Sequence, residues 1–344
     1  MLTRWDRSRC FVIAEAGVNH NGDIAVAKRL IDAAKDAGAD AVKFQTWITE
    51  LIVTEDSASA DYQQQNTGKQ SQYELLKALE LSHDQFIQLK DYAHQVGIWF
   101  LSTPDEEVSA EFLLSNGMEL IKVGSGELTN LPFLDFLARK RLPMIVSTGM
   151  ATMQEVESAV TTIQEAGTID LSLLHCVSNY PADPADCNLR AMATMRKEFG
   201  LPVGYSDHTM GNEICLAAVA LGATIIEKHL TLDRTMDGPD HGCSSEPAEF
   251  AELVKGIRDI ESAMGDGVKQ PVSCELATRK VVRKEIVAKR DMRIGEILQI
   301  SDLTLKRGNG EGLGSDQFEN VIGKCVIEAI PENALVLPSK LSVT

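Results

Sequence analysis

Short apolar runs alternate with amphipathic helical stretches through the first four-fifths of the chain, and this alternation limits the possible folds more than any other feature. The nearly continuous apolar character of each run is typical of parallel strands that are covered on both faces. The runs are CFVIAEAG, AVKFQTW, GIWFLSTP, LIKVGSGE, PMIVSTGM, LSLLHCVSN, PVGYSDHT and TIIEKHLT. Eight β–α units in this order predict an α/β fold of the (β/α)8 TIM-barrel type.

A doubly wound open sheet is the alternative fold, and it would usually carry a GxGxxG turn after its first strand. Here that turn reads EAGVNHNG, which lacks the pattern. We therefore expect a barrel over residues 1–265 and a linker over 266–282. Over 283–344, short β-like pieces separated by Gly, Asn, Asp and Pro predict a small, mostly β domain. The long polar segment over 46–74 predicts a lid or binding loop.

Charge and cysteine usage narrow the class of protein. The net charge is −17, which argues against nucleic acid or an anionic membrane surface as the main partner. The seven cysteines are scattered and form no CxxC motif, so neither a disulfide framework nor a zinc cluster is favoured. No apolar run is long enough to cross a bilayer or to form a signal peptide. We expect a cytoplasmic protein with reduced cysteines.

Polar residues gather where the predicted strands end, which is where the active sites of such barrels lie. Buried charges are costly unless they are paired, so packing alone does not explain a ring that contains Lys, Glu and His. The ring comprises Glu15, Lys43, Gln45, Ser102, Thr103, Lys122, Ser125, Glu127, Ser147, Thr148, His175, Ser178, Asn179, Tyr180, Ser206, Asp207, His208, Glu227, Lys228 and His229.

Two lysines of this ring, with hydroxyl residues beside glycines in GSGE and STG, predict a phosphate site. Ammonium groups balance the charge, while hydroxyls and backbone N–H groups approach the oxygens closely. The alternative is that Lys43 and Lys122 extend outward to solvent and the serines are turn residues.

His208 and His229 end two successive strands, so we expect their rings to be neighbours. Taken singly, each is more simply explained as a hydrogen-bonded side chain. Taken together, they can bind one divalent ion, with Glu15 available directly or through water. A two-histidine site with open positions suits Mn²⁺ better than structural zinc, which takes four protein ligands. His20 and His175 are further candidates, although His20 is also explained as a residue that orders its turn.

Six motifs together resemble the sialic acid synthase family over nearly the whole chain. They are IAEAGVNHNGD, ADAVKFQTW, IKVGSGELTN, MIVSTGMAT, the stretch from GYSDHT to DGPDH, and KRGNGEG. The resemblance implies a (β/α)8 barrel followed by an antifreeze-like (SAF) domain. It also implies condensation of phosphoenolpyruvate with open-chain N-acetylmannosamine and water, giving N-acetylneuraminate and phosphate. We further expect a domain-swapped homodimer in which the SAF domain caps the partner's barrel.

The same resemblance implies roles for individual residues. His208 and His229 would bind Mn²⁺, or another divalent ion such as Mg²⁺ or Co²⁺, which polarises the sugar aldehyde. The expected catalytic residues are Glu15, Lys122, Glu127, His208 and His229. The expected phosphoenolpyruvate ligands are Lys43, Ser125, Ser147, Ser178 and Ser206. The expected sugar ligands are Tyr180, Asp240 and Arg307, the last reaching into the neighbouring subunit.

One position departs from the family pattern. Family members often place an asparagine two residues before the tyrosine of YP, where this chain has Ser178. Asn179 is shifted by one residue, which on a strand turns the side chain to the opposite face. We therefore expect Ser178 to replace the amide contact.

Three other functions remain open. The runner-up is N,N'-diacetyllegionaminate synthase, acting on 2,4-diacetamido-2,4,6-trideoxymannose, because nothing in the sequence reads the substituents of the sugar. A 6-phosphorylated sugar is less favoured, since no second cationic cluster is evident. A non-catalytic carbohydrate-binding protein is the alternative of another class, although sugar binding alone requires neither a metal nor a phosphate site.

Overall fold

The computed structural model describes residues 8–59, 63–64, 68 and 71–343. The chain divides into two compact units, Met1–Gly265 and Asp266–Thr344. Each unit has hydrophobic clusters of its own, and each is described separately.

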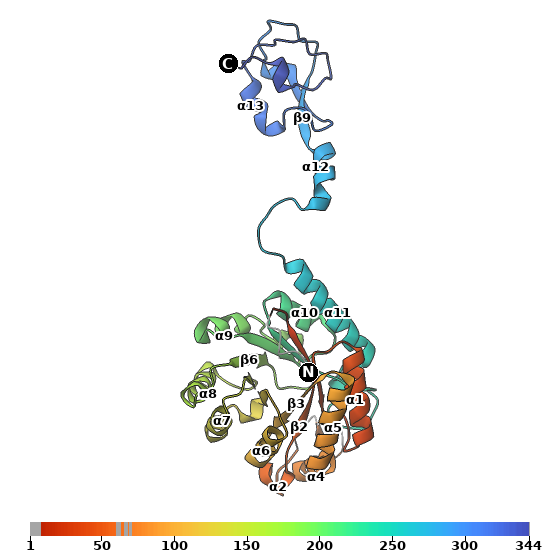
Figure 1. The fold of residues 1–344 in the computed structure, drawn as a ribbon, viewed down its shortest axis with the longest axis vertical. Helices are drawn as coiled ribbons and strands as arrows, with labels where there is room; N and C mark the ends of the chain where they lie inside the picture. Colours follow the sequence, from red (N-terminus) through yellow and green to blue (C-terminus); the bar gives the residue numbers. More distant parts are fainter. Residues whose placement is uncertain (1–7, 60–62, 65–67, 69–70, 344) are drawn as a thin grey trace. The chain divides into compact units, whose positions relative to one another are not determined.

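The first unit is a ring of parallel strands with helices around it (Figure 1). Hydrogen bonds join the strands in the order β3-β2-β1-β8-β7-β6-β5-β4, and β3 lies against β4 to close the ring. The strands are β1 (Phe11–Gly17), β2 (Ala41–Thr46), β3 (Trp99–Pro104), β4 (Ile121–Val123), β5 (Met144–Ser147), β6 (Leu171–Cys176), β7 (Val203–Asp207) and β8 (Ile225–His229). The predicted barrel is confirmed.

The helices carry the capping signals that the sequence contains. Ser82 and Gln85 form a capping box at the start of α5, and Gly97 ends that helix in the left-handed conformation with φ 79°. The helices of this unit are α1 (Ile24–Asp36), α2 (Thr49–Ile52), α4 (Gln72–Leu79), α5 (His83–Val96), α6 (Glu107–Ser115), α7 (Leu131–Ala138), α8 (Met153–Glu165), α9 (Ala191–Phe199), α10 (Glu213–Ala220) and α11 (Pro247–Met264).

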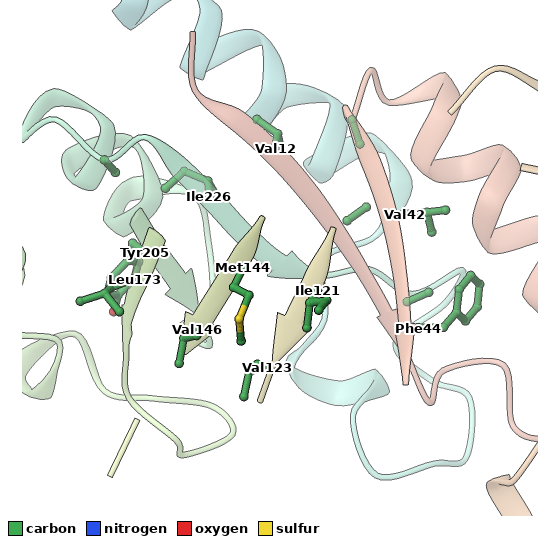
Figure 2. Packing of buried hydrophobic residues seen from close by; sticks show 14 of the residues in the cluster. Val12, Val42, Phe44, Ile121, Val123, Met144, Val146, Leu173, Tyr205 and Ile226 are labelled. Atoms are coloured by element: carbon green, nitrogen blue, oxygen red, sulfur yellow. The ribbon is translucent and has the colours of Figure 1, made fainter. Parts of the chain in front are cut away.

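Strand alternation gives the barrel two apolar layers. One face of the strands supplies the barrel interior, where Ile13, Leu101, Ile145 and Leu174 pack together with other buried residues. The opposite face packs under the helices, and Figure 2 shows residues of this outer layer, including Val12 and Val146. Every strand of this ring is therefore buried on both faces, as its apolar run predicts.

The polar segment over 46–74 contains α2 and the start of α4, and an antiparallel bridge pairs Ala58 with Ser71. Within it, residues 60–62, 65–67 and 69–70 lie outside the described part of the chain, so the predicted lid stays a prediction.

The second unit is small, with an antiparallel pair of strands, as the SAF-type sequence predicts. Its core includes Ile286, Leu298, Leu303 and Val336. Its regular elements are α12 (Leu276–Val282), β9 (Lys284–Ala288), β10 (Leu303–Arg307) and α13 (Phe318–Val321), with short 3-10 helices between them. The stretch expected as a linker, 266–282, thus contains α12, none of whose residues is buried. Among the described residues, no helix is both long and apolar enough to cross a membrane.

Candidate active site

The alternation of strand residues sorts the polar ring into two groups. Side chains with the same parity as the barrel-interior residues lie at its mouth, and those of opposite parity lie among the helices. Lys228 is of the second kind, because its Nζ lies 2.6 Å from Asp207 Oδ2, which also accepts from the thiol of Cys215 on α10. His175 likewise bonds the Cys187 carbonyl, with 2.8 Å between Nε2 and O. Part of the predicted ring is therefore structural.

Two lysines and two glutamates form the centre of the inward group. Lys43 Nζ lies 2.7 Å from Glu15 Oε2 and 3.8 Å from Glu227 Oε2. Lys122 Nζ lies 3.5 Å from Glu227 Oε1. All four side chains are at most 7% exposed. The four formal charges sum to zero, which is how a protein interior tolerates ions.

These charges set one another's pKa. Burial lowers the pKa of Lys43, but Glu15 and Glu227 outweigh burial and raise it. For Lys122 burial prevails and lowers the pKa despite Glu227. Burial raises the pKa of Glu15 against the charge of Lys43. Burial alone would also raise the pKa of Glu227, yet Lys122 and Lys43 lower it to about 2. Glu227 is thus firmly ionised.

Hydroxyl groups surround this centre. Lys122 donates to Ser147 Oγ at 2.8 Å, and Lys43 donates to Thr103 Oγ1 at 3.0 Å. Ser206 Oγ donates to Glu227 Oε1 at 3.1 Å. Hydroxyls and ammonium groups that converge in this way are the groups that bind phosphate oxygens.

A second set of hydroxyls lies around Gly149. A Cβ atom on this glycine would meet Ser178 Oγ at 2.2 Å and Ser125 Oγ at 2.8 Å, so only hydrogen fits there. The Gly149 N–H donates to Ser125 Oγ at 3.0 Å. Asn179, in contrast, is exposed and donates to the Pro181 carbonyl. Ser178, not Asn179, therefore joins the predicted phosphate residues.

The two strand-end histidines are neighbours, with ring centroids 5.5 Å apart. The Tyr180 ring lies 4.2 Å from that of His208 and 5.7 Å from that of His229. Asp240 Oδ2 lies 3.9 Å from His229 Nδ1. The predicted metal and sugar residues of the first unit thus share one corner of the barrel mouth.

The chemistry of these imidazoles fits a divalent ion. Burial lowers the pKa of both rings, so both are neutral, as metal ligands must be. His208 Nδ1 donates to the Val177 carbonyl at 2.6 Å, which leaves Nε2 with its lone pair. His229 Nδ1 is buried and has no hydrogen-bond partner among the described residues. Metal–imidazole bonds are about 2.1 Å long, so ring centroids 5.5 Å apart are compatible with both rings binding one ion.

Within the described part of the chain, no group of three or more His, Cys, Asp and Glu side chains is arranged to hold a metal. Two imidazole ligands would leave several open positions on an ion at this corner. That is the arrangement of a site that also binds substrate or water, and it differs from a closed structural site.

Two carboxylates are more important here than the sequence indicates. Glu227 has no individual role among the sequence-based expectations, yet it contacts both lysines. Its spacing of two residues before His229 is the signal that places it inside the barrel.

Asp105 is the second carboxylate. It directly follows β3 with the same parity as Thr103, and it is absent from the predicted ring. Burial, and then the charge of Glu127, raise the pKa of Asp105 to about 7.

The remaining predicted residues are more dispersed. Glu127 accepts from Asn130 Nδ2 at 2.7 Å, at the start of α7. His20 accepts from the Gly22 N–H and lies against Phe44, on the outer face of the strands, so it orders its turn. Arg307 ends β10 in the second unit, where its side chain is exposed.

A separate apolar cavity of about 350 Å³ lies between α5, β3 and α6. Phe86, Phe100 and Phe112 line it, and none of the charged residues of the barrel mouth does. The candidate active site is the barrel mouth and not this cavity, because the ionised and hydrogen-bonding groups of the mouth can take part in a reaction.

Comparisons with known proteins show the family of this chain. A model of the NeuB family matches residues 30–269, and a SAF domain model matches residues 283–342. An N,N'-diacetyllegionaminic acid synthase from Legionella pneumophila is 48% identical over 319 residues, which cover 91% of this chain and 89% of the relative. An N-acetylneuraminate-9-phosphate synthase from Homo sapiens is 39% identical over 329 residues, which cover 95% of this chain and 91% of the relative.

The solved structures give the same result. A crystal structure of N-acetylneuraminic acid synthetase from Leptospira borgpetersenii, in complex with citrate, matches with a TM-score of 0.71 and 37% identity. The match covers 80% of this chain and 93% of that chain.

Proposed function

The chain belongs to the NeuB family and ends in a SAF domain, and on this basis we propose that this enzyme joins phosphoenolpyruvate to the open-chain aldehyde of an N-acylated amino sugar. N-acetylmannosamine is the proposed sugar, with N-acetylneuraminate and phosphate as products. The observation that supports the proposal best is the pairing of two lysines with Glu227 beside two neutral imidazoles. A sugar-binding module needs neither group.

The proposed phosphate site consists of the two lysines and the serines around them. Lys43 and Lys122 would neutralise the phosphate, with Ser125, Ser147, Ser178 and Ser206 as hydroxyl donors. An anion at this position satisfies the ammonium groups in place of the carboxylates that contact them in the free protein. Both reactants would then be oriented in one partly enclosed site, which removes much of the entropic barrier.

We propose that His208 and His229 hold a divalent ion such as Mn²⁺. When bound, the ion supplies a Lewis acid that polarises a carbonyl oxygen. His208 is oriented for this by its bond to the Val177 carbonyl. Tyr180 and Asp240, beside the histidines, would contact the sugar.

The chain's carboxylates serve the later steps of the proposed reaction. C3 of phosphoenolpyruvate attacks the aldehyde carbon, and positive charge develops at C2. Glu15 and Glu127 would stabilise that charge, Glu15 from inside the barrel and Glu127 from the start of α7. Water adds at C2, and the C–O bond to phosphate then breaks. Arg307 would grip the N-acyl group from the partner subunit of a domain-swapped homodimer.

A second sugar is favoured by a specific observation. The Legionella pneumophila relative, 48% identical, is named as an N,N'-diacetyllegionaminic acid synthase. We therefore propose 2,4-diacetamido-2,4,6-trideoxymannose as the alternative substrate, with N,N'-diacetyllegionaminate as its product. The chemistry at phosphoenolpyruvate is the same for both sugars.

The test is an assay with phosphoenolpyruvate, Mn²⁺ and a panel of sugars, with phosphate release and mass spectrometry of the product. The panel contains N-acetylmannosamine, its 6-phosphate and the trideoxy sugar. We expect phosphate release with one sugar and a product heavier by the pyruvate unit. Sugar binding without phosphate release from any of them would make the protein a carbohydrate-binding module.

The metal has a test of its own. His208→Ala and His229→Ala should abolish metal-dependent turnover and leave the circular dichroism spectrum unchanged. Full activity of the double variant after chelation would remove the ion from the proposed reaction.

A further inference from the structure

The KRGNGEG segment forms a loop whose two ends both pair with strand β9. β10 ends at Arg307, which pairs with Lys284 of β9. The chain then turns through 308–313 and meets β9 again, where Gly314 pairs with Glu285. The two ends of the loop therefore pair with adjacent residues of β9, Lys284 and Glu285. Arg307 stands at the start of this loop, with its side chain exposed.

The side chain of Glu285 fills the centre of this loop. It is only 4% exposed. Its Oε1 accepts from the Gly312 N–H at 2.6 Å, and its Oε2 accepts from the Gly310 N–H at 3.1 Å. Two backbone donors are thus bound by one carboxylate, and hydrogen bonds to a charged group are the stronger kind.

The glycines of the motif are explained by this carboxylate and by α12. A Cβ atom on Gly308 would lie 1.8 Å from Glu285 Oε2, and one on Gly312 would lie 3.2 Å from Oε1. Gly310 has φ +82°, and a Cβ atom there would lie 2.4 Å from Cγ of Lys280. Each glycine therefore lets the backbone close around Glu285 or under the Lys280 stem. These contacts all lie within the second unit.

We propose that Glu285 is a positioning residue for sugar binding: by holding the N–H groups of Gly310 and Gly312, it fixes the loop after Arg307 and hence the direction of that guanidinium. This inference rests on the proposed function, in which Arg307 grips the N-acyl group. Glu285 itself touches no substrate. Its loss lets the loop move, so a bound sugar must order the loop again.

The first measurement needs no activity. Hydrogen exchange, followed by mass spectrometry of peptides that span 306–314 in the full-length protein, compares Glu285→Gln with the parent chain. The neutral amide retains one acceptor and places N–H groups where the carboxylate accepted, so we expect exchange in this segment to rise about tenfold. Glu311→Gln is the matched control, because Glu311 is an exposed glutamate of the same loop that pairs with Asn309. Unchanged exchange in Glu285→Gln overturns the inference.

The second measurement separates the two substrates. Glu285→Gln should raise the KM for the active sugar of the panel about tenfold, while the KM for phosphoenolpyruvate stays near the parent value. A merely structural role would change both KM values together. Glu311→Gln should leave both KM values unchanged.

A double variant tests whether Glu285 acts through Arg307. In an Arg307→Ala background, Glu285→Gln should add almost nothing to the sugar KM, since its target is gone. If the two substitutions raise the sugar KM by factors that multiply in the double variant, Glu285 does not act through Arg307, and the inference is overturned.

Gly308→Ala should also displace the Glu285 carboxylate, because its methyl group takes the place of Glu285 Oε2. We expect the same rise in sugar KM, so the inference stays testable if Glu285→Gln folds poorly.

Failure of the proposed sugar contact and failure of the positioning role give different results. If Arg307→Ala leaves the sugar KM unchanged, the proposed sugar contact fails, and with it this role. If Arg307→Ala raises the KM but Glu285→Gln and Gly308→Ala do not, the inference alone fails.

Discussion

At the scale of single residues, Glu227 is the carboxylate that both lysines of the barrel mouth share. It contacts both Lys43 and Lys122, and Ser206 donates to it. Removing one partner of a buried ion pair leaves the other charge without compensation, which costs about 3–5 kcal/mol. Glu227 is thus important for the stability of the barrel.

We therefore expect Glu227→Gln to lower the free energy of unfolding by about 3 kcal/mol. Phosphate ions should restore part of the loss, since an anion bound to the folded state stabilises it. Urea unfolding with and without inorganic phosphate measures both effects. Glu157→Gln, an exposed site on α8, is the control. Equal stability of parent and Glu227→Gln would show that the carboxylate is not needed to compensate the lysines.

Asp105 gives a pH-dependent prediction. Burial and Glu127 raise its pKa from 3.8 to about 7 in the folded protein. Between these two values the unfolded chain loses the proton and the folded protein keeps it, so stability falls as the pH rises through this interval. Asp105→Asn removes this dependence. The side chain is partly accessible to solvent, so we expect a gain of about 1–2 kcal/mol rather than the full linkage.

Melting curves of parent and Asp105→Asn at several pH values measure the gain. The variant should melt higher at about pH 8 and equally at about pH 4, by roughly 2–4 °C per kcal/mol. A difference that is the same at both pH values would mean that ionisation of Asp105 is not its cause.

At the scale of strands and helices, Gly204 of β7 shows how closely the barrel interior is packed. A Cβ atom there would lie 2.4 Å from the Ile225 carbonyl oxygen and 2.7 Å from Leu174 Cδ2. Backbone of a neighbouring strand cannot rotate away as a side chain can. Gly204→Ala should therefore destabilise the barrel by about 1–3 kcal/mol.

Chemical denaturation measures this change, and Gly242→Ala is the matched control, because a Cβ atom on Gly242 would meet nothing within 4 Å. If both variants have the parent's stability, the interior has more free space than the distances indicate.

The strands are also where the sequence was most informative. Their apolar runs predicted eight units, and counting by two along β7 and β8 places Ser206 and Glu227 inside the barrel. The division of the ring into inward and outward groups was not predicted, because polar residues occupy both kinds of position at the strand ends. Asp207 and Lys228 are examples, since they form a buried pair outside the site.

Other features could not be read from sequence. α12 has no buried residue, so it carries no apolar periodicity that would distinguish it from a linker. Glu285 looks like any charged strand residue, and only the path of the chain after Arg307 brings two N–H groups to its carboxylate. Contacts that join distant segments depend on the fold and leave no local pattern.

At the scale of the whole molecule, two separate hydrophobic cores imply two units that can fold without each other. Residues 265–284 between them are exposed throughout, and Lys269 lies in their irregular part. Limited trypsin digestion should therefore cut first in this segment. The fragment that ends near residue 269 should unfold in one transition close to the parent's barrel transition, as mass spectrometry and calorimetry would show. First cuts inside 1–265, or a fragment without a transition, would contradict two independent cores.

The balanced charges at the barrel mouth have a consequence for turnover. In the proposed reaction, an entering phosphate would compete with Glu227 for ammonium groups that already have a partner. When phosphate departs, the carboxylate would pair with them again, so departure would leave neither lysine without a partner. The resident glutamate would thus lower the cost of phosphate release.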